Sequence, residues 1–280
     1  MDKTNETLYG IQSTELEILK YFDEFCREND IKYSLSGGTL LGAIRHKGFI
    51  PWDDDVDCMV MREDYDKLFE LWNDKADTEK YFLQNKENSN AFSQSFAKIR
   101  KNHTTFLQED DVEGAYHHGL FIDIMPADRI PNGTIKRKLF YLNVMLYQLF
   151  NREFAPPLSS SFVQFGCNVI LFFTKHSDRA KLRAKYLKKL TKYDDDKSLE
   201  IVSFETVSSM HRHYSPDLMD KFIDVPFEDT TLKVTSKWQE VLETGYGDYM
   251  QFPPKEEQIW KHHPILINFE KDYNELKKDN

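Results

Sequence analysis

Residues 36–57 of the chain read SGGTLLGAIRHKGFIPWDDDVD, and this stretch decides the fold prediction. In an extended backbone, side chains two residues apart point to the same side, so Asp55 and Asp57 should project together while Val56 faces the other way. Two carboxylates held that close repel unless a proton or a cation lies between them. The pair therefore indicates either a solvated acidic turn or a site for a hard divalent cation, Mg²⁺ or Mn²⁺.

A third carboxylate lies in residues 119–126, which otherwise have the pattern of a buried strand. A lone charge such as Asp123 is costly there unless it is paired or bound to a metal. Together with the first two aspartates it predicts a three-carboxylate site, both catalytic and metal-binding, of the kind used in phosphoryl transfer. The alternative is a buried Asp123 that forms an ion pair with Arg100 or Arg129.

The glycine turn predicts a phosphate site. Glycine lets a ligand approach the backbone, and a short helix with Thr39 as its N-cap would point free N–H groups at a phosphate. The basic triplet that follows could neutralise a diphosphate, although such a triplet is also typical of a solvated helix end. The predicted donor-binding residues are Gly37, Gly38, Thr39, Arg45, His46 and Lys47.

The remaining pattern predicts an α+β fold. Thr14 and Glu17 match a capping box, which starts a helix that ends near Asn29–Asp30. Pro156-Pro157 marks a break between two helical stretches. Strands are expected at residues 32–36, 55–61, 81–84, 93–99 and 120–125, with a strand or two within 225–254; helices are expected at 39–44, 64–72, 135–151, 159–190 and around 238–242.

The composition excludes several functional classes to which the chain could belong. A net charge of −10 over 280 residues argues against a nucleic-acid partner, which requires a basic surface. Three separated cysteines and a polar N-terminus without a signal segment indicate a cytoplasmic protein. The longest apolar run, residues 162–173, is too short to span a bilayer, so it predicts a core helix or at most a peripheral contact with the inner face of the membrane.

Two adjacent histidine pairs, His117-His118 and His262-His263, lack the spacing of metal ligands on one helix face. Surface or hydrogen-bonding roles are expected for them.

Three blocks of the sequence resemble one family. Residues 36–57 closely resemble the signature of the LicD family, the bacterial phosphocholine transferases related to fukutin and fukutin-related protein. Residues 119–128 resemble its second acidic strand, and residues 246–263 its C-terminal block. The resemblance implies a nucleotidyltransferase-like mixed sheet with flanking helices. Its expected parts are a catalytic core at 12–130, a helical insertion at 131–218 on the acceptor or membrane side, and a segment at 219–280 that completes the core.

The same resemblance implies a reaction. A phospho-alcohol, with phosphocholine favoured, would move from a CDP-linked donor such as CDP-choline to a hydroxyl of a cell-surface glycan or its lipid-linked precursor, of teichoic acid or capsule type, and CMP would be released. Asp55 and Asp57 would hold Mg²⁺ or Mn²⁺, with Asp123 as the third carboxylate.

A quaternary ammonium would need an aromatic surface, for which Trp52, Tyr246 and Tyr249 are candidates. The alternatives are a nucleotide-sugar glycosyltransferase with an Asp-x-Asp motif and a non-catalytic glycan-binding protein.

Overall fold

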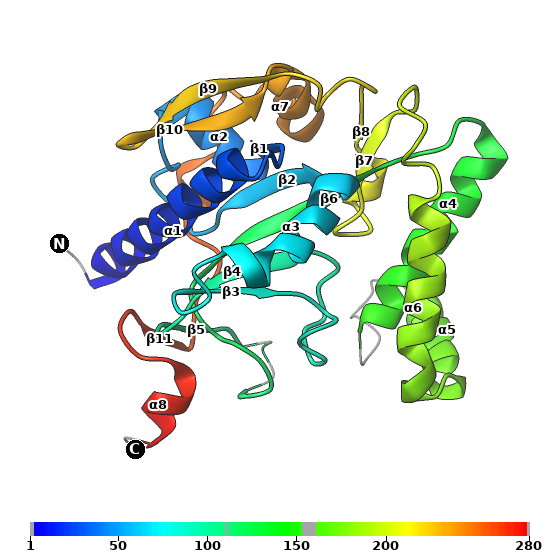
Figure 1. Cartoon of the computed structure of the whole chain (residues 1–280), viewed down its shortest axis with the longest axis horizontal. Coiled ribbons are helices and arrows are strands. Elements are labelled where there is room, and N and C mark those ends of the chain that lie inside the picture. The colour runs from blue at the N-terminus through cyan, green and yellow to red at the C-terminus, as the bar shows by residue number, and fades with distance from the viewer. Residues whose placement is uncertain (1–2, 110, 112, 153–160, 279–280) are drawn as a thin grey trace.

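A mixed β-sheet forms the centre of the computed structural model, which describes residues 3–109, 111, 113–152 and 161–278 (Figure 1). The helices are α1 (Lys3–Glu28), α2 (Gly37–His46), α3 (Arg62–Lys75), α4 (Thr134–Asn151), α5 (Ser161–Phe173), α6 (His176–Thr191), α7 (Trp238–Tyr246) and α8 (Tyr273–Lys278). The strands are β1 (Tyr33–Leu35), β2 (Asp57–Met61), β3 (Tyr81–Gln84), β4 (Ala97–Lys101), β5 (Thr105–Leu107), β6 (Phe121–Arg129), β7 (Ile201–Ser203), β8 (His213–Tyr214), β9 (Phe222–Phe227), β10 (Thr230–Thr235) and β11 (Leu266–Asn268). Helices and mixed strands in this order confirm the predicted α+β class.

Strand β6 organises the sheet, whose order is β1-β2-β6-β4-β3, with β7 also on β6 and β8 on β7. Only the β2–β6 pair is parallel among the described strands of this sheet. Alternation along β2 and β6 sends Cys58, Val60, Ile122 and Ile124 into the main hydrophobic core. Two further pairs lie outside this sheet: the β9–β10 hairpin and β5 with β11.

Helices α1 and α3 both contact β6, and they pack against each other through Trp72, whose ring centroid lies 5.1 Å from that of Phe25. Helix α1 begins at Lys3, so the capping box predicted at Thr14 is wrong. Thr14 lies inside the helix, where its hydroxyl donates to the Gly10 carbonyl at 2.9 Å. The helix extends toward the N-terminus because Leu8 and Ile11 continue its buried apolar stripe.

Several predicted boundaries are shifted. Helix α2 begins at Gly37 with Ser36 in the N-cap position, so the N-cap prediction for Thr39 is wrong. Strand β4 covers residues 97–101 instead of 93–99, and the helix predicted over 159–190 is two helices separated near Thr174, whose N–H donates to the Leu171 carbonyl at 3.3 Å. The predicted break at Pro156-Pro157 lies outside the described residues.

Helices α4, α5 and α6 form a helical arm at one side of the sheet (Figure 1). The arm is joined to the sheet by a second core, in which Phe140 and Val144 of α4 and Leu190 of α6 pack with Val202 and Phe204. Strands β7 and β8 follow α6 in the sequence and add to the same sheet. Strand β7 pairs with β6, and β8 pairs with β7. No described helix combines the length and the hydropathy that crossing a membrane requires.

Candidate functional site

A row of charged side chains crosses three strands. Asp57 is paired with Asp123 in the parallel β2–β6 register, and Lys98 of β4 is paired with Asp123 on the other side. The Asp123 N–H donates to the Val56 carbonyl at 2.8 Å, which fixes the two aspartates as neighbours. Lys98 Nζ donates to Asp123 Oδ1 at 2.6 Å, and both residues are buried. The sheet register therefore brings Asp57 and Asp123 together and holds one oxygen of Asp123 with a buried cation.

Neither arginine considered as a partner pairs with Asp123. Arg100 donates to Gln84 Oε1 at 2.6 Å and to the Gly119 carbonyl at 2.7 Å. Arg129 donates to the Leu199 carbonyl at 2.7 Å. The predicted ion pair with Arg100 or Arg129 is therefore wrong. Asp123 pairs with Lys98 instead, because the β4–β6 register sets Lys98 opposite Asp123 and Arg100 opposite Phe121.

The glycine turn accommodates the carboxylates. Gly37 has φ +54°, and a Cβ atom at this position would overlap the Asp57 carboxylate; a Cβ atom at Gly38 would lie 2.6 Å from Asp53 Oδ2. Both carboxylates thus lie against the first turn of α2, where the positive end of the helix favours negative charge. The Asp57 N–H donates to Thr39 Oγ1 at 2.9 Å, so Thr39 positions the aspartate from a buried location.

The carboxylates raise one another's proton affinity. Burial, together with Asp55 and Asp54, raises the pKa of Asp53 to about 8. Burial first, then Asp55 and Asp123, raises the pKa of Asp57 well above its ordinary value. Burial also raises the pKa of Asp55. Such a cluster holds protons unless a cation neutralises it.

The cluster fits a divalent cation by its donor chemistry, which consists of hard carboxylate oxygens beside a glycine turn with no room for side chains. Within the described residues, its carboxylate oxygens do not all lie within 4.8 Å of one another. Over the described part of the chain, the group with ligand atoms all within 4.8 Å of one another is His103, Asp272 and Glu275, at the surface.

Glu15 is a further acid near the cluster, and the sequence analysis did not identify it. The side chain of Glu15 on α1 is 3% exposed, and its Oε2 has no hydrogen-bond partner within the described residues. Burial, followed by Asp55 and Asp54, raises the pKa of Glu15 well above its ordinary value. A signal was available, because Glu15 shares the buried stripe of α1 with Ile11 and Ile18 at spacings of four and three residues.

Asp54 connects the C-terminal segment to the cluster. It accepts the N–H groups of Lys261 at 3.2 Å and of His262 at 2.7 Å, and its Oδ1 lies 3.3 Å from His262 Nδ1. Burial acts to raise the pKa of Asp54, but the bond and charge of His262 lower it overall. The same bond raises the pKa of His262. The hydrogen-bonding role predicted for His262 is confirmed.

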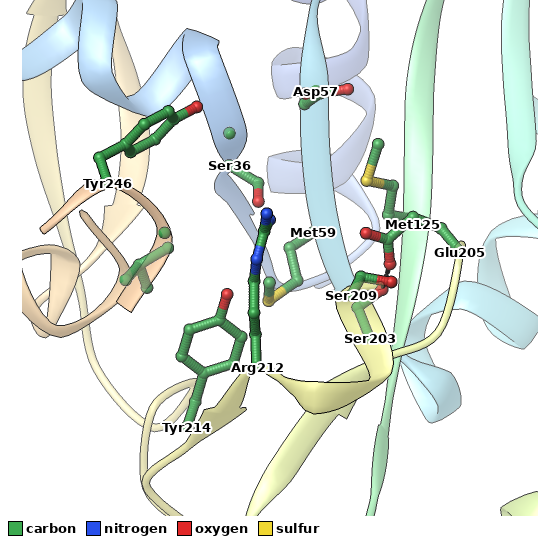
Figure 2. Close-up of a pocket in the computed structure, with 13 residues that line it drawn as sticks. Ser36, Asp57, Met59, Met125, Ser203, Glu205, Ser209, Arg212, Tyr214 and Tyr246 are labelled. Carbon is green, nitrogen blue, oxygen red and sulfur yellow. Dashed lines mark hydrogen bonds between the residues drawn. The ribbon is translucent and has the colours of Figure 1, made fainter. Parts of the chain in front are cut away.

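A cavity opens beside Asp57 (Figure 2). Figure 2 shows the Arg212 side chain extending toward Ser36 at the start of α2, and Glu205 with Ser203 on the opposite side. The Ser203 hydroxyl donates to the Glu205 carboxylate. The cavity lining consists of Ser36, Gly37, Asp57, Met59, Met125, Ser203, Glu205, Ser209, Arg212, Tyr214, Val241, Gly245 and Tyr246. Anionic, cationic, aromatic and thioether groups thus surround one space next to the carboxylates.

The basic triplet lies at the other end of α2, about 15 Å from the glycine turn for a ten-residue helix. Arg45 donates to the Tyr249 carbonyl at 3.0 Å and lies over the Phe252 ring at 4.4 Å. His46 contacts Trp52 and Phe252 edge-on. The Lys47 side chain is exposed. Arg45 and His46 therefore hold the C-terminal loop, and the structure does not bring the triplet to the glycines.

Of the three aromatic candidates, Tyr246 lines the cavity, whereas Trp52 packs against His46 and Tyr249 against Trp238. Lys98, Glu205 and Arg212 were missed. Lys98 alternates with apolar Ala97 and Ile99 in a strand, which marks it as a cation on one strand face; Glu205 and Arg212 lie in irregular chain that gives no such signal.

Comparisons with known proteins identify the family of the chain. Residues 30–169 match the family described as LicD/FKTN/FKRP, nucleotidyltransferase domain. The chain is 31% identical over 265 residues to the lipopolysaccharide cholinephosphotransferase LicD of Haemophilus influenzae, which covers 90% of this chain and 94% of that protein. It is also 56% identical over 34 residues to the human ribitol 5-phosphate transferase FKRP, or 12% of this chain and 7% of that protein.

Proposed function

The chain belongs to the LicD/FKTN/FKRP family and is a transferase of phosphorus-containing groups, and we propose that it moves phosphocholine from CDP-choline to a hydroxyl of a cell-surface glycan or its lipid-linked precursor. The similarity to a lipopolysaccharide cholinephosphotransferase along nearly the whole chain supports both the phosphocholine group and the glycan acceptor. Teichoic acid and capsule precursors belong to the same acceptor class.

Asp55, Asp57 and Asp123 would hold Mg²⁺ or Mn²⁺. The observation that carries this assignment is the in-register pairing of Asp57 with Asp123, beside an Asp55 whose charge acts on Asp57. When bound, the cation would neutralise the carboxylates and stabilise charge on the departing CMP. Lys98 holds Asp123 in place through its hydrogen bond to Oδ1.

In the proposed reaction, the acceptor hydroxyl attacks the β-phosphorus of CDP-choline. A new bond forms between the acceptor oxygen and the β-phosphorus, and the bond from the β-phosphorus to the bridging oxygen breaks, so that CMP leaves with that oxygen. The hydroxyl proton passes to a carboxylate of the cluster. The residues of this chain contribute mainly orientation and charge, which dominate catalysis of phosphoryl transfer.

The cavity beside Asp57 is suited to the donor's phosphocholine end. Arg212 offers a guanidinium to a phosphate oxygen, on the side that faces the first turn of α2. Glu205, Tyr214 and Tyr246 offer the carboxylate and aromatic surfaces that favour a quaternary ammonium. The presence of guanidinium, carboxylate and aromatic groups in one cavity supports a donor that carries phosphocholine.

A donor panel tests the proposal. The protein is incubated with Mg²⁺ and CDP-choline, CDP-ethanolamine, CDP-ribitol, CDP-glycerol or a UDP-sugar, with and without a glycan acceptor. We expect acceptor-dependent CMP release that is fastest with CDP-choline. Release of UDP in place of CMP would support a glycosyltransferase, and turnover of no donor would support a glycan-binding protein.

Donor placement has its own test. Arg212→Ala should raise the donor KM at least tenfold because it removes a phosphate contact, whereas Lys47→Ala, at the far end of α2, should leave the KM within about twofold. Steady-state kinetics at varied CDP-choline measure both. An effect of Lys47→Ala larger than that of Arg212→Ala would place the diphosphate at the basic triplet after all.

A further inference from the structure

Helix α5 presents a bare apolar face. Its sequence, residues 161–173, contains no charged residue. One side, with Cys167 and Leu171, packs against α4. Within the described residues the other side is exposed: Phe165 is 66% exposed and Phe172 82% exposed, and Phe173 beside it is 80% exposed. Phe165 and Phe172 are seven residues apart, so they lie on one helix face, opposite the packed side.

The apolar surface continues along α4. Ile135, Leu139, Leu142 and Met145 recur at helical spacing, and all four are exposed, Ile135 to 84%. The same stripe runs on to residues 146 and 149, where α5 covers it. The exposed part of α4 is thus the uncovered remainder of a stripe whose end is already used for packing. Two neighbouring helices together leave an area of apolar surface larger than scattered residues would produce.

Positive charge flanks this surface. Residues 161–192 contain eight lysines or arginines and one aspartate, in a chain whose net charge is −10. Lys175 follows Phe173 by two residues, and Lys181, Lys185, Lys188 and Lys189 on α6 are all exposed. Exposed apolar side chains next to clustered cations are typical of a helix that lies in the interface of an anionic membrane.

We infer that the arm formed by α4, α5 and α6 docks on an anionic phospholipid surface, with Phe165, Phe172 and Phe173 among the acyl chains and the α6 lysines at the phosphates. A 13-residue helix is about 20 Å long, shorter than the hydrocarbon core, so α5 lies in the plane of the interface. A second copy of this chain is a poorer occupant, because two such faces would bring their cations together. The arm stands to one side of the sheet whose strands β2 and β6 carry Asp57 and Asp123 (Figure 1).

Vesicle sedimentation tests this surface without reference to catalysis. The full chain is mixed with vesicles of phosphatidylglycerol and phosphatidylcholine or of phosphatidylcholine alone, at low and high salt. We expect sedimentation with the anionic vesicles that falls at least tenfold at high salt, and little sedimentation with phosphatidylcholine alone. No sedimentation with anionic vesicles, or equal sedimentation with both kinds, would overturn the inference.

Matched variants locate the surface. Phe172→Glu should lower vesicle binding at least tenfold, while Ile223→Glu, on the exposed face of β9, should not. Lys188→Glu with Lys189→Glu should have the same effect, while Lys277→Glu with Lys278→Glu on α8 should not, although both are exposed lysine pairs at the ends of helices. Circular dichroism confirms that each variant folds.

Two further results would contradict the docking surface. One is equal loss of binding in the α8 control pair, which would show a general charge effect. The other is a concentration-dependent dimer that Phe172→Glu abolishes while vesicle binding survives, which would assign the face to a second copy. Failure of the donor panel would leave the vesicle result unchanged, because sedimentation requires no turnover.

Discussion

Lys98 and Asp123 are opposite one another on β4 and β6, and their side chains are only 9% and 12% exposed. Burial lowers the pKa of Lys98, and Asp123 opposes that shift. Removing one member of such a pair leaves the other charge buried and uncompensated, which is far more costly than replacing both with apolar groups. Breaking the pair should therefore destabilise the fold, and the intact pair orients Asp123.

This pairing changes what Asp123→Asn should do. The variant should lower the free energy of unfolding by about 3 kcal/mol, because Lys98 loses its partner. A double variant, Lys98→Met with Asp123→Leu, should recover most of that loss while activity stays absent. Urea unfolding of the wild type and both variants measures the effect. An Asp123→Asn midpoint equal to that of the wild type would mean that the ion pair contributes nothing.

Glu15 predicts a pH-dependent difference in stability. Burial raises its pKa in the folded state, so the folded state binds the proton more tightly and the wild type loses stability as pH rises above about 4.5, the ordinary value. Gln cannot ionise, so the metal-free Glu15→Gln variant should gain melting temperature relative to the wild type as pH rises from about 4.5 toward about 8. The exposed Glu24→Gln on the same helix is the control. A Tm difference independent of pH would show that Glu15 is not held neutral.

At the scale of single residues, the sequence was sufficient to identify those site candidates that stand out in a local pattern. Asp55, Asp57 and Asp123 lie in or beside strands with clear alternation, and the structure gathers them. The partner of Asp123 could not be chosen, because it depends on the register between β4 and β6, and a shift of two residues would have selected Arg100.

At the scale of secondary-structure elements, helix α2 connects the glycine turn with the carboxylates. Its first turn receives Asp53 and Asp57 where the sequence suggested an open phosphate cradle. The positive end of the helix dipole thus faces the protein's own acids. Any side chain at Gly37 would both strain the backbone and displace Asp57.

Gly37→Ala should therefore lower turnover at least a hundredfold, on the order of 3 kcal/mol of transition-state stabilisation. Gly166→Ala in α5 is the control, since a Cβ atom there meets nothing within 4 Å. Turnover of CDP-choline and melting temperature are measured for both variants. If a folded Gly37→Ala protein kept wild-type turnover, the Asp57 carboxylate could not depend on this turn.

Elements with strong local periodicity were predictable, and short strands were not. Strand β3 has its predicted bounds, whereas β5, β7, β8 and β11 contain two or three residues each and exist through pairing with distant segments. The start of α1 was missed because a capping-box match at Thr14 competes with an apolar stripe that begins earlier.

At the scale of the whole molecule, the C-terminal part of the chain packs against the N-terminal part. Asp54 holds the backbone at His262, and β11 pairs with β5, so the last part of the chain lies beside the first acidic turn. The helical arm, which consists of α4, α5 and α6 from the middle of the sequence, extends away from the sheet (Figure 1). The acidic cluster and the exposed apolar and basic surface thus lie in different parts of one molecule.

The central claim is that the β-phosphoryl group of CDP-choline moves to a glycan through the carboxylate cluster. CDP-choline labelled with ³²P at the β-phosphorus tests it most directly, with wild type, Asp57→Asn and, as the control, the exposed Asp220→Asn. The account predicts label in the acceptor and unlabelled CMP for the wild type and Asp220→Asn, with at least a hundredfold less transfer by Asp57→Asn. Label that stays out of the acceptor, or equal transfer by Asp57→Asn, would contradict it.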